Sequence, residues 1–286
     1  MKTGYMKNPQ IFLPACTADC YTRWKTGSDM DRNLQRFCAI ANDALGPGGV
    51  RTIVEIGARD CHETIDFHAT FPQAHIYTFE CNPATLPKCR AAVLGKSGIT
   101  LIECAVSNAS GPVTFYSIDQ EHTKTDVQDG NPGGSSLLRA SGKYELETYV
   151  QKPVTVDAIT LSDVFRQQGI ETADLMWMDI QGAELMALEG AGDRLKDVKL
   201  IHTEVEFVEI YAGQPLFPEI KGWLEARGFV FLGFTTYSRH FGDAVFANPR
   251  WVPARKRLAV VRRNPLLLWK RLTWIRHRVK RSILGK

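Results

Sequence analysis

Short apolar runs alternate with amphipathic stretches from about residue 50 onward. The apolar runs are nearly continuous, and we expect each to form a β-strand: Thr52–Gly57, His75–Glu80, Ile99–Ser107, Ala173–Ile180, Val198–Val205 and Phe229–Thr235. Strands of this kind are typical of a sheet that is buried on both faces. The stretches between them predict short helices: Cys61–Phe71, Pro83–Leu94, Leu161–Gln168, Ala183–Gly190 and Phe217–Arg227. This alternation indicates an α/β fold in which crossover helices cover the sheet.

The segment Ser117–Val150 interrupts the alternation. It contains the turn-forming run DGNPGGSS and has little apolar content. Because long insertions in a compact domain are usually functional or disordered, we interpret this segment as a loop over the site. Ahead of the first strand, Asp31–Leu45 is the better candidate for a helix. We therefore expect an N-terminal helical extension at residues 1–45, a catalytic α/β domain at residues 46–250 and a basic tail at residues 251–286.

The tail predicts an amphipathic basic helix. Five apolar residues repeat at helical spacing among lysines and arginines: Leu268, Leu272, Ile275, Val279 and Ile283. The net charge of +4 is unevenly distributed along the chain. Residues 244–286 hold 13 Lys/Arg and no Asp/Glu, while residues 1–243 carry a net charge of −9. Such a helix can lie on an anionic membrane surface, and the alternative is a solvated or domain-docked helix. We expect no nucleic acid partner, because no recognition motif accompanies the basic residues.

Composition narrows the class of protein. The chain is 44% apolar and 23% charged, as is usual for globular proteins. Its seven cysteines have no CxxC spacing, which argues against a disulfide framework or a zinc site. The N-terminus lacks the pattern of a secretory signal, and no apolar window reaches the length needed to span a bilayer. We expect a cytoplasmic protein, with peripheral association at the inner face of the membrane as an option.

The ends of the first two strands suggest an adenosine site. The first strand runs into VEIGARDCHE, where Gly57 permits close approach of a ligand, and Glu80 ends the second strand at the spacing of an acid that binds a ribose. A dinucleotide would require GxGxxG, which is absent, whereas S-adenosylmethionine has no phosphate and its ammonium suits Glu55. The alternative is that both acids are ordinary strand-end charges. The complete predicted cofactor-binding set is Glu55, Gly57, Ala58, Glu80, Cys81, Asn82 and Ala105.

Several runs in this order resemble the FkbM family of methyltransferases over about residues 50–235: VEIGARDCHE, FECNP, AVSNASGPVTFY, GGSSLL and MDIQGAELMALEGA. The last run is the most specific. The resemblance implies a Rossmann-like class I methyltransferase fold with a seven-stranded, mostly parallel sheet, helices on both faces and an antiparallel last strand. It also implies methyl transfer to oxygen. The sequence departs from the family pattern at Cys61, commonly glycine, at Cys81, commonly proline, and at Trp177, often lysine.

Methyl transfer to a hydroxyl needs alignment and removal of a proton. Asp179 follows the fourth main strand, and we predict that it is the base or that it orients the acceptor; the alternative is a helix cap. Glu204 and His202 lie on the same face of the next strand and are further catalytic candidates, although His202 also fits a core position. We predict no obligatory metal, because two carboxylates without a close third ligand make a weak metal site.

The loop supplies two further candidates, Ser135 and Ser136, whose hydroxyls follow two glycines. They could fold over cofactor and acceptor, or they could belong to a solvated turn. The preferred acceptor is a hydroxyl of a sugar in a glycan or a lipid-linked saccharide. A small-molecule or protein acceptor is the alternative within the same enzyme class. A non-catalytic scaffold that keeps the fold is the alternative from another class.

Overall fold

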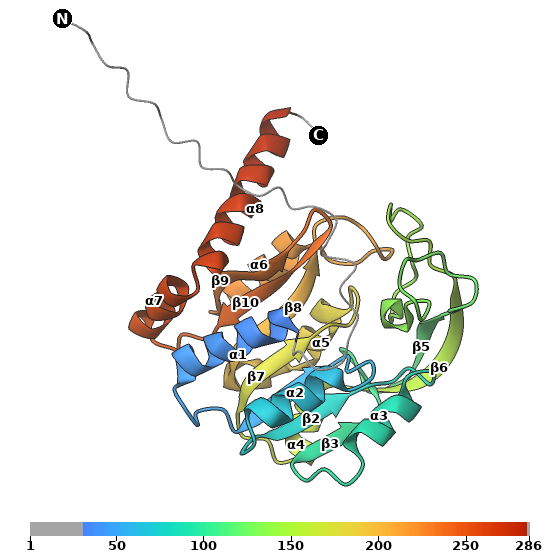
Figure 1. Ribbon diagram of the computed structural model, residues 1–286, viewed down its shortest axis with the longest axis horizontal. Coiled ribbons are helices and arrows are strands. Elements are labelled where there is room, and N and C mark those ends of the chain that lie inside the picture. Colours follow the sequence, from blue (N-terminus) through green and yellow to red (C-terminus); the bar gives the residue numbers. More distant parts are fainter. Residues whose placement is uncertain (1–30, 285–286) are drawn as a thin grey trace, which may run out of the picture. The chain divides into compact units, whose positions relative to one another are not determined.

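The main sheet has seven strands in the order β3-β2-β1-β7-β8-β10-β9 (Figure 1). The computed structural model describes residues 31–284, with side chains as far as Arg276. Strands β1, β2, β3, β7 and β8 pair in parallel, whereas β10 is antiparallel to both of its neighbours. Their bounds are β1 Thr52–Ile56, β2 His75–Phe79, β3 Ile99–Ile102, β7 Ala173–Met178, β8 Val198–Glu206, β9 Val230–Tyr237 and β10 Phe241–Ala247. The Rossmann-like fold expected from the sequence is confirmed.

The predicted helices are present with bounds close to those expected: α1 Arg32–Leu45, α2 His62–Thr70, α3 Leu86–Val93, α4 Leu161–Gln167, α5 Glu184–Gly190 and α6 Phe217–Ala226. Local capping explains two of the starts. The Asp31 side chain accepts a hydrogen bond from Asn33 N at the start of α1, and the Thr160 side chain accepts one from Asp163 N at the start of α4. These bonds satisfy N–H groups that have no partner inside the helix.

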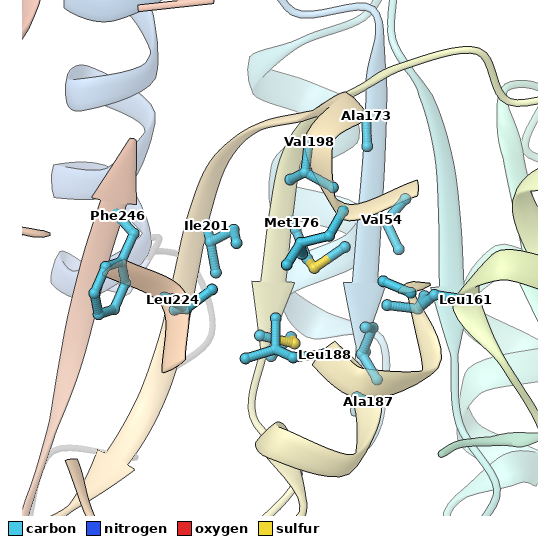
Figure 2. Packing of buried hydrophobic residues seen from close by; sticks show 14 of the residues in the cluster. Val54, Leu161, Ala173, Met176, Ala187, Leu188, Val198, Ile201, Leu224 and Phe246 are labelled. Atoms are coloured by element: carbon cyan, nitrogen blue, oxygen red, sulfur yellow. The ribbon is translucent and has the colours of Figure 1, made fainter. Parts of the chain in front are cut away.

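The helices cover the sheet on both faces. On one face, residues of β1, β7 and β8 pack with α4, α5 and α6 in the largest apolar cluster (Figure 2). Met176 of β7 lies at its centre and is fully buried. On the other face, Phe37 of α1 and Phe67 of α2 both contact Trp177 of β7. Successive side chains of a strand point to opposite faces, so Met176 and Trp177 separate these two cores.

A second, three-stranded sheet was not predicted. Its order is β4-β6-β5, formed by Ala105–Val106, Gln151–Ile159 and Gly111–Ile118. The single strand expected at Ile99–Ser107 is therefore wrong: it divides into β3 of the main sheet and β4, which pairs in parallel with β6 instead. Apolar periodicity continues across the division, so the sequence alone did not reveal that the partner strand changes.

The tail forms two helices, α7 (Ala254–Arg263) and α8 (Pro265–Leu284). Helix α8 lies against β9, the edge strand of the main sheet (Figure 1). A Cβ atom at Gly233 of β9 would lie 2.4 Å from the carbonyl oxygen of Leu267, so the helix backbone directly approaches the strand. Among the described helices, none is long and apolar enough to cross a membrane.

Candidate active site at the carboxyl edge of the sheet

Gly57 joins the ends of three strands. Its N–H and that of Ala58 donate to the carbonyl oxygen of Phe79, at 3.0 and 2.9 Å, which ties the end of β1 to the end of β2. A Cβ atom at Gly57 would lie 2.0 Å from the carbonyl oxygen of Asp179, just beyond β7, and the residue has a φ of +91°. Only glycine fits this close approach. The predicted cofactor and acceptor regions therefore adjoin each other.

The turn that follows Gly57 shows why glycine is common in the family where this chain has Cys61. Cys61, at the start of α2, has a φ of +62°, and it is fully buried. A left-handed conformation favours glycine, so a cysteine here holds a strained backbone. The neighbouring Arg59 is also left-handed, with a φ of +54°, and forms an ion pair with Asp129 of the long loop at 3.1 Å.

Glu80 organises the loops that follow β1 and β2. One of its carboxylate oxygens accepts from Arg59 N at 2.7 Å, and the other accepts from Cys81 N and Asn82 N at 2.8 and 2.6 Å. Burial raises the pKa of this carboxyl group, and the three backbone donors oppose that shift. The Thr85 side chain also hydrogen-bonds the group and lowers its pKa, so protein donors use about all four lone-pair directions of the carboxylate. A role of Glu80 toward a ribose hydroxyl stays a prediction.

Glu55 lies deeper than the sequence suggested. Its side chain is fully buried, and one oxygen accepts a hydrogen bond from the Thr64 hydroxyl of α2 at 2.5 Å. The other oxygen has no hydrogen-bond partner. Burial raises its pKa to about 8. The observed contacts tie α2 to β1, and a role of Glu55 toward the ammonium of a cofactor stays a prediction.

Two carboxyl groups, those of Asp179 and Glu204, meet beyond β7 and at the end of β8. The side-chain amide of Gln181 donates to both of them, at 2.6 Å in each case. Gln181 has a φ of +58°, a left-handed conformation that is costly for a residue with a side chain. Its amide oxygen and the carbonyl oxygen of Gly134 share the Tyr211 hydroxyl, at 2.9 and 2.8 Å. The two predicted catalytic acids are thus held as a pair.

Burial raises the pKa of both members of this pair. The Asp179 side chain reaches solvent, yet protein atoms surround the carboxyl group closely, and this desolvation raises its pKa. The hydrogen bond from Gln181 and the positive charge of Arg59 act in the opposite direction. Burial, followed by the charge of Asp179, holds the pKa of Glu204 well above its usual range. A raised pKa makes a carboxylate a stronger base than an ordinary one, which is the direction that a general base requires.

The alternative role of Asp179 as a helix cap is not what the structure shows. The residue at the N-cap of α5 is Ala183, which has no side-chain capping bond. Glu184 acts there instead, because its Oε1 accepts from Ile180 N at 3.0 Å. The carboxylate of Asp179 instead hydrogen-bonds Gln181 and Glu204.

Further acids surround the pair. Burial raises the pKa of Glu184 and that of Asp243 to about 7, and holds the pKa of Glu206 well above its usual range. Neither carboxylate oxygen of Glu206 has a hydrogen-bond partner. Within residues 31–284, no group of three His, Cys, Asp or Glu side chains is arranged to hold a metal ion.

The long loop does lie over this edge, but its serines are not exposed. Ser135 is 7% exposed; its hydroxyl accepts from the Asn82 amide at 3.1 Å and donates to the carbonyl oxygen of Pro132 at 2.7 Å. Ser136 is 1% exposed and donates to the carbonyl oxygen of Gln181 at 2.7 Å. The two serines fasten the loop to the turns after β2 and β7, so they do not belong to a solvated turn, and a contact with cofactor or acceptor stays a prediction.

His202 lies in the core and not at the carboxyl edge of the sheet. It is fully buried on the middle of β8, and its Nε2 lies 2.9 Å from the Thr235 hydroxyl. Burial lowers its pKa to about 3, so the ring is neutral near pH 7. The structure favours the alternative for His202, a core histidine, although only its Nε2 and not its Nδ1 has a hydrogen-bond partner. Trp177, which departs from the family lysine, packs against the same ring.

The remaining predicted residues flank the cofactor region. Cys81 is partly exposed, and Ala105 is buried at the start of β4. Asn82 is 2% exposed, and its amide oxygen accepts from the Ser117 hydroxyl at 3.0 Å. Two site residues, Gln181 and Tyr211, were not predicted. Gln181 lies inside the run MDIQG that carried the resemblance, whereas nothing in the apolar pattern marks Tyr211.

Comparisons with known proteins identify the family of this chain. The profile of a family described as the methyltransferase FkbM domain matches residues 55–231. The 2-O-methyltransferase NoeI of Sinorhizobium fredii (strain NBRC 101917 / NGR234) is 29% identical over 163 residues, which are 57% of this chain and 66% of NoeI. The methyltransferase sdnD of Sordaria araneosa is 28% identical over 192 residues, which are 62% of this chain and 73% of sdnD.

Among solved structures, the precorrin-6y C5,15-methyltransferase of Geobacter metallireducens GS-15 aligns with a TM-score of 0.39 at 12% identity, over 74% of this chain and 89% of that one.

Proposed function

The chain belongs to the FkbM methyltransferase family, and we propose that it transfers a methyl group from S-adenosylmethionine to a hydroxyl oxygen of its acceptor. The observation that carries the proposal is the pair of Asp179 and Glu204, which Gln181 holds together beside the strand ends that fit a nucleoside. Family membership gives the reaction class. The pair gives the group that a hydroxyl acceptor needs.

The residues at the ends of β1 and β2 fit this methyl donor. Glu80 directly follows β2, and the hydrogen bonds of Gly57 and Ala58 to the carbonyl oxygen of Phe79 hold the end of β1 beside it, where the ribose would lie. The donor carries a sulfonium and an ammonium, and an acidic surrounding stabilises both charges. When bound, it supplies an activated methyl group on a sulfonium sulfur, which leaves as a neutral thioether. The absence of a GxGxxG run is consistent with a ligand that has no pyrophosphate.

Asp179 has the position of the base. We assign it the removal of the hydroxyl proton as the acceptor oxygen bonds to the methyl carbon and the sulfur–methyl bond breaks. The proton passes to the Asp179 carboxylate and from there to solvent, which the side chain reaches. Gln181 acts as a positioning residue, because its amide fixes the orientation of Asp179 and Glu204. General-base help of this kind contributes about 10²- to 10⁴-fold in rate.

A sugar hydroxyl is the acceptor that we favour. The support is the resemblance to NoeI, whose name describes a 2-O-methyltransferase. The chain spans 66% of the length of NoeI, so features outside the shared region can differ. The loop fastened by Ser135 and Ser136 would shape the acceptor side of the site, because it is tied to the turns that follow β2 and β7.

The test has two steps on the full chain. Calorimetric titration with S-adenosylmethionine measures donor binding, and radiolabelled donor then reports methyl transfer to a panel of mono- and oligosaccharides, phenols and peptides. We expect donor binding with a Kd on the order of 1–100 μM, and alkali-stable methyl ethers on a saccharide. Absence of donor binding, or methylation only at nitrogen or carbon, would overturn the proposal.

A further inference from the structure

Helix α8 has one face that is fixed to the sheet. The Lys270 ammonium donates to the carbonyl oxygen of Thr235, and the Arg271 guanidinium donates to that of Phe231 at 3.2 Å. Both carbonyl groups belong to β9, the edge strand. Leu267 is 2% exposed, and the ring of Trp274 packs edge-on against Phe217 at 5.0 Å. These contacts set the rotation of the helix about its own axis.

The face of α8 that adjoins the docked one carries exposed apolar side chains. Leu268, Leu272 and Ile275 are 45%, 45% and 39% exposed, and we call these three residues the apolar stripe. Their spacing of four and three residues places them along one line of the helix. The side chain of Trp269 is 48% exposed, and Arg276 is exposed as well. Docking to the sheet has therefore not buried the apolar residues that the sequence singled out.

The charge around the stripe has one sign. Residues 244–286 contain 13 Lys/Arg and no Asp/Glu. Arg255 and Arg262 of α7 and Arg276 of α8 are exposed, and none of these three has an ion-pair partner in the part of the chain that the structure describes. Isolated exposed apolar residues need no explanation, but a line of them beside unpaired cations and a tryptophan is typical of an interfacial helix.

We propose that the apolar stripe of α8, with the cations of α7 and α8, docks the protein on an anionic lipid bilayer. The helix would lie parallel to the surface, with Leu268, Leu272 and Ile275 among the acyl chains and the arginines at the headgroups. Trp269 fits the boundary between them, where amphipathic rings concentrate. In the sequence, Val279 and Ile283 continue the spacing of the stripe. An anionic bilayer is favoured over a protein partner because residues 244–286, which carry the stripe, contain basic residues and no acidic ones.

Docking would act through structure that is already in place. Since β9 holds α8, the helix does not have to fold on the membrane, and the cost of ordering it is small. Apolar burial and charge attraction are two separate signals, and neither alone gives firm attachment. The proposal is independent of methyl transfer and concerns where the enzyme finds its acceptor, such as a saccharide linked to lipid.

The test uses flotation of the full-length protein with vesicles of phosphatidylcholine alone or of phosphatidylcholine with roughly one third phosphatidylglycerol, an anionic lipid that gives the bilayer a negative surface potential. We expect binding to the anionic vesicles only, falling at least about tenfold between low and high salt. The double variant Leu268→Glu and Leu272→Glu should bind at least about tenfold more weakly. The matched control is Leu94→Glu, which places the same change at another exposed leucine, 83% exposed, and should bind as the unchanged protein does.

Melting temperature and binding of S-adenosylmethionine by each variant show that the fold is intact. Failure to bind anionic vesicles at low salt overturns the proposal, and so does binding that the double variant retains. Light scattering tests the alternative that a second copy of the chain covers the stripe. If the unchanged protein is a dimer and the double variant a monomer, the stripe is an interface between copies and the proposal is wrong. A double variant that unfolds is replaced by Ile275→Ser, for which the same loss of binding is required.

Discussion

The indole ring of Trp177 stacks on the imidazole ring of His202, with centroids 3.9 Å apart and planes at 1°. Phe37 packs on both rings, at 5.8 Å from the indole and 4.9 Å from the imidazole. The residue that departs from the family lysine is therefore a core residue of the face covered by α1 and α2. The stack accounts for the neutral, buried His202 without any catalytic role.

Trp177→Ala should reduce the free energy of unfolding by about 3–5 kcal/mol, the usual cost of removing a large buried aromatic side chain. Chemical denaturation checks the value. Trp269→Ala is the matched control, because the side chain of Trp269 is 48% exposed, and it should change the free energy of unfolding by less than about 0.5 kcal/mol. Equal effects of the two variants would show that the stack does not stabilise the core.

Glu80→Ala should weaken binding of S-adenosylmethionine by tenfold or more, since loss of a hydrogen bond to a charged group costs about 1.5–3 kcal/mol. It also leaves the N–H groups of Arg59, Cys81 and Asn82 without their acceptor, so the loops after β1 and β2 lose order. Calorimetric titration measures the affinity. Glu225→Ala, an exposed acid on α6, is the control with unchanged affinity. Full affinity in folded Glu80→Ala would refute the assignment.

Asp179→Asn should reduce turnover by about 10²- to 10⁴-fold, because it removes the base while keeping the shape of the side chain. A base works only when deprotonated, and desolvation raises the pKa of Asp179. Turnover of the unchanged enzyme should therefore rise with pH through a limb that lies above the ordinary carboxyl range of about 4. The pH–rate profile is the measurement, and this limb should be missing in the variant.

Two further measurements separate a base from a structural residue. Donor affinity and melting temperature of Asp179→Asn should stay close to those of the unchanged protein. His202→Gln should keep the position of the pH limb, whatever it does to stability, because His202 lies in the core. If Asp179→Asn retains full turnover while Glu204→Gln loses it, the base is the other member of the pair.

Glu55→Gln should stabilise the protein at high pH. The folded-state pKa of Glu55 is about 8, above the ordinary value of 4.5. The contribution of a group with a raised pKa is fully present below its unfolded pKa and is lost as pH rises through the folded one. The difference in stability between variant and unchanged protein should therefore grow between about pH 4.5 and 8, to a few kcal/mol.

Thermal unfolding at a series of pH values measures this difference. Glu225→Gln, at an exposed site, should give a difference that does not depend on pH. The prediction fails if the advantage of Glu55→Gln is the same at pH 5 and pH 8, because the carboxyl group would then be ionised to the same extent in both folded and unfolded chains.

The sequence by itself determined the layers of the fold. Apolar runs such as Thr52–Gly57 and Ala173–Ile180 match β1 and β7 to within two residues, because a strand buried on both faces has few polar positions. The run MDIQG placed Asp179 at the active edge, since the carboxyl ends of parallel strands meet there. The amphipathic period of the tail predicted α8 in the same way.

Only the tertiary structure decided which side chains meet. Gln181 reaches both Asp179 and Glu204 because β7 pairs with β8, a relation that no local pattern contains. Ser136 fastens the loop to Gln181 across 45 residues of sequence. Local periodicity fixes which face of an element is apolar, whereas the choice of partner depends on strand order and register. For that reason the two layers of helices were predictable, whereas the hydrogen bonds from Gln181 to Asp179 and Glu204 were not.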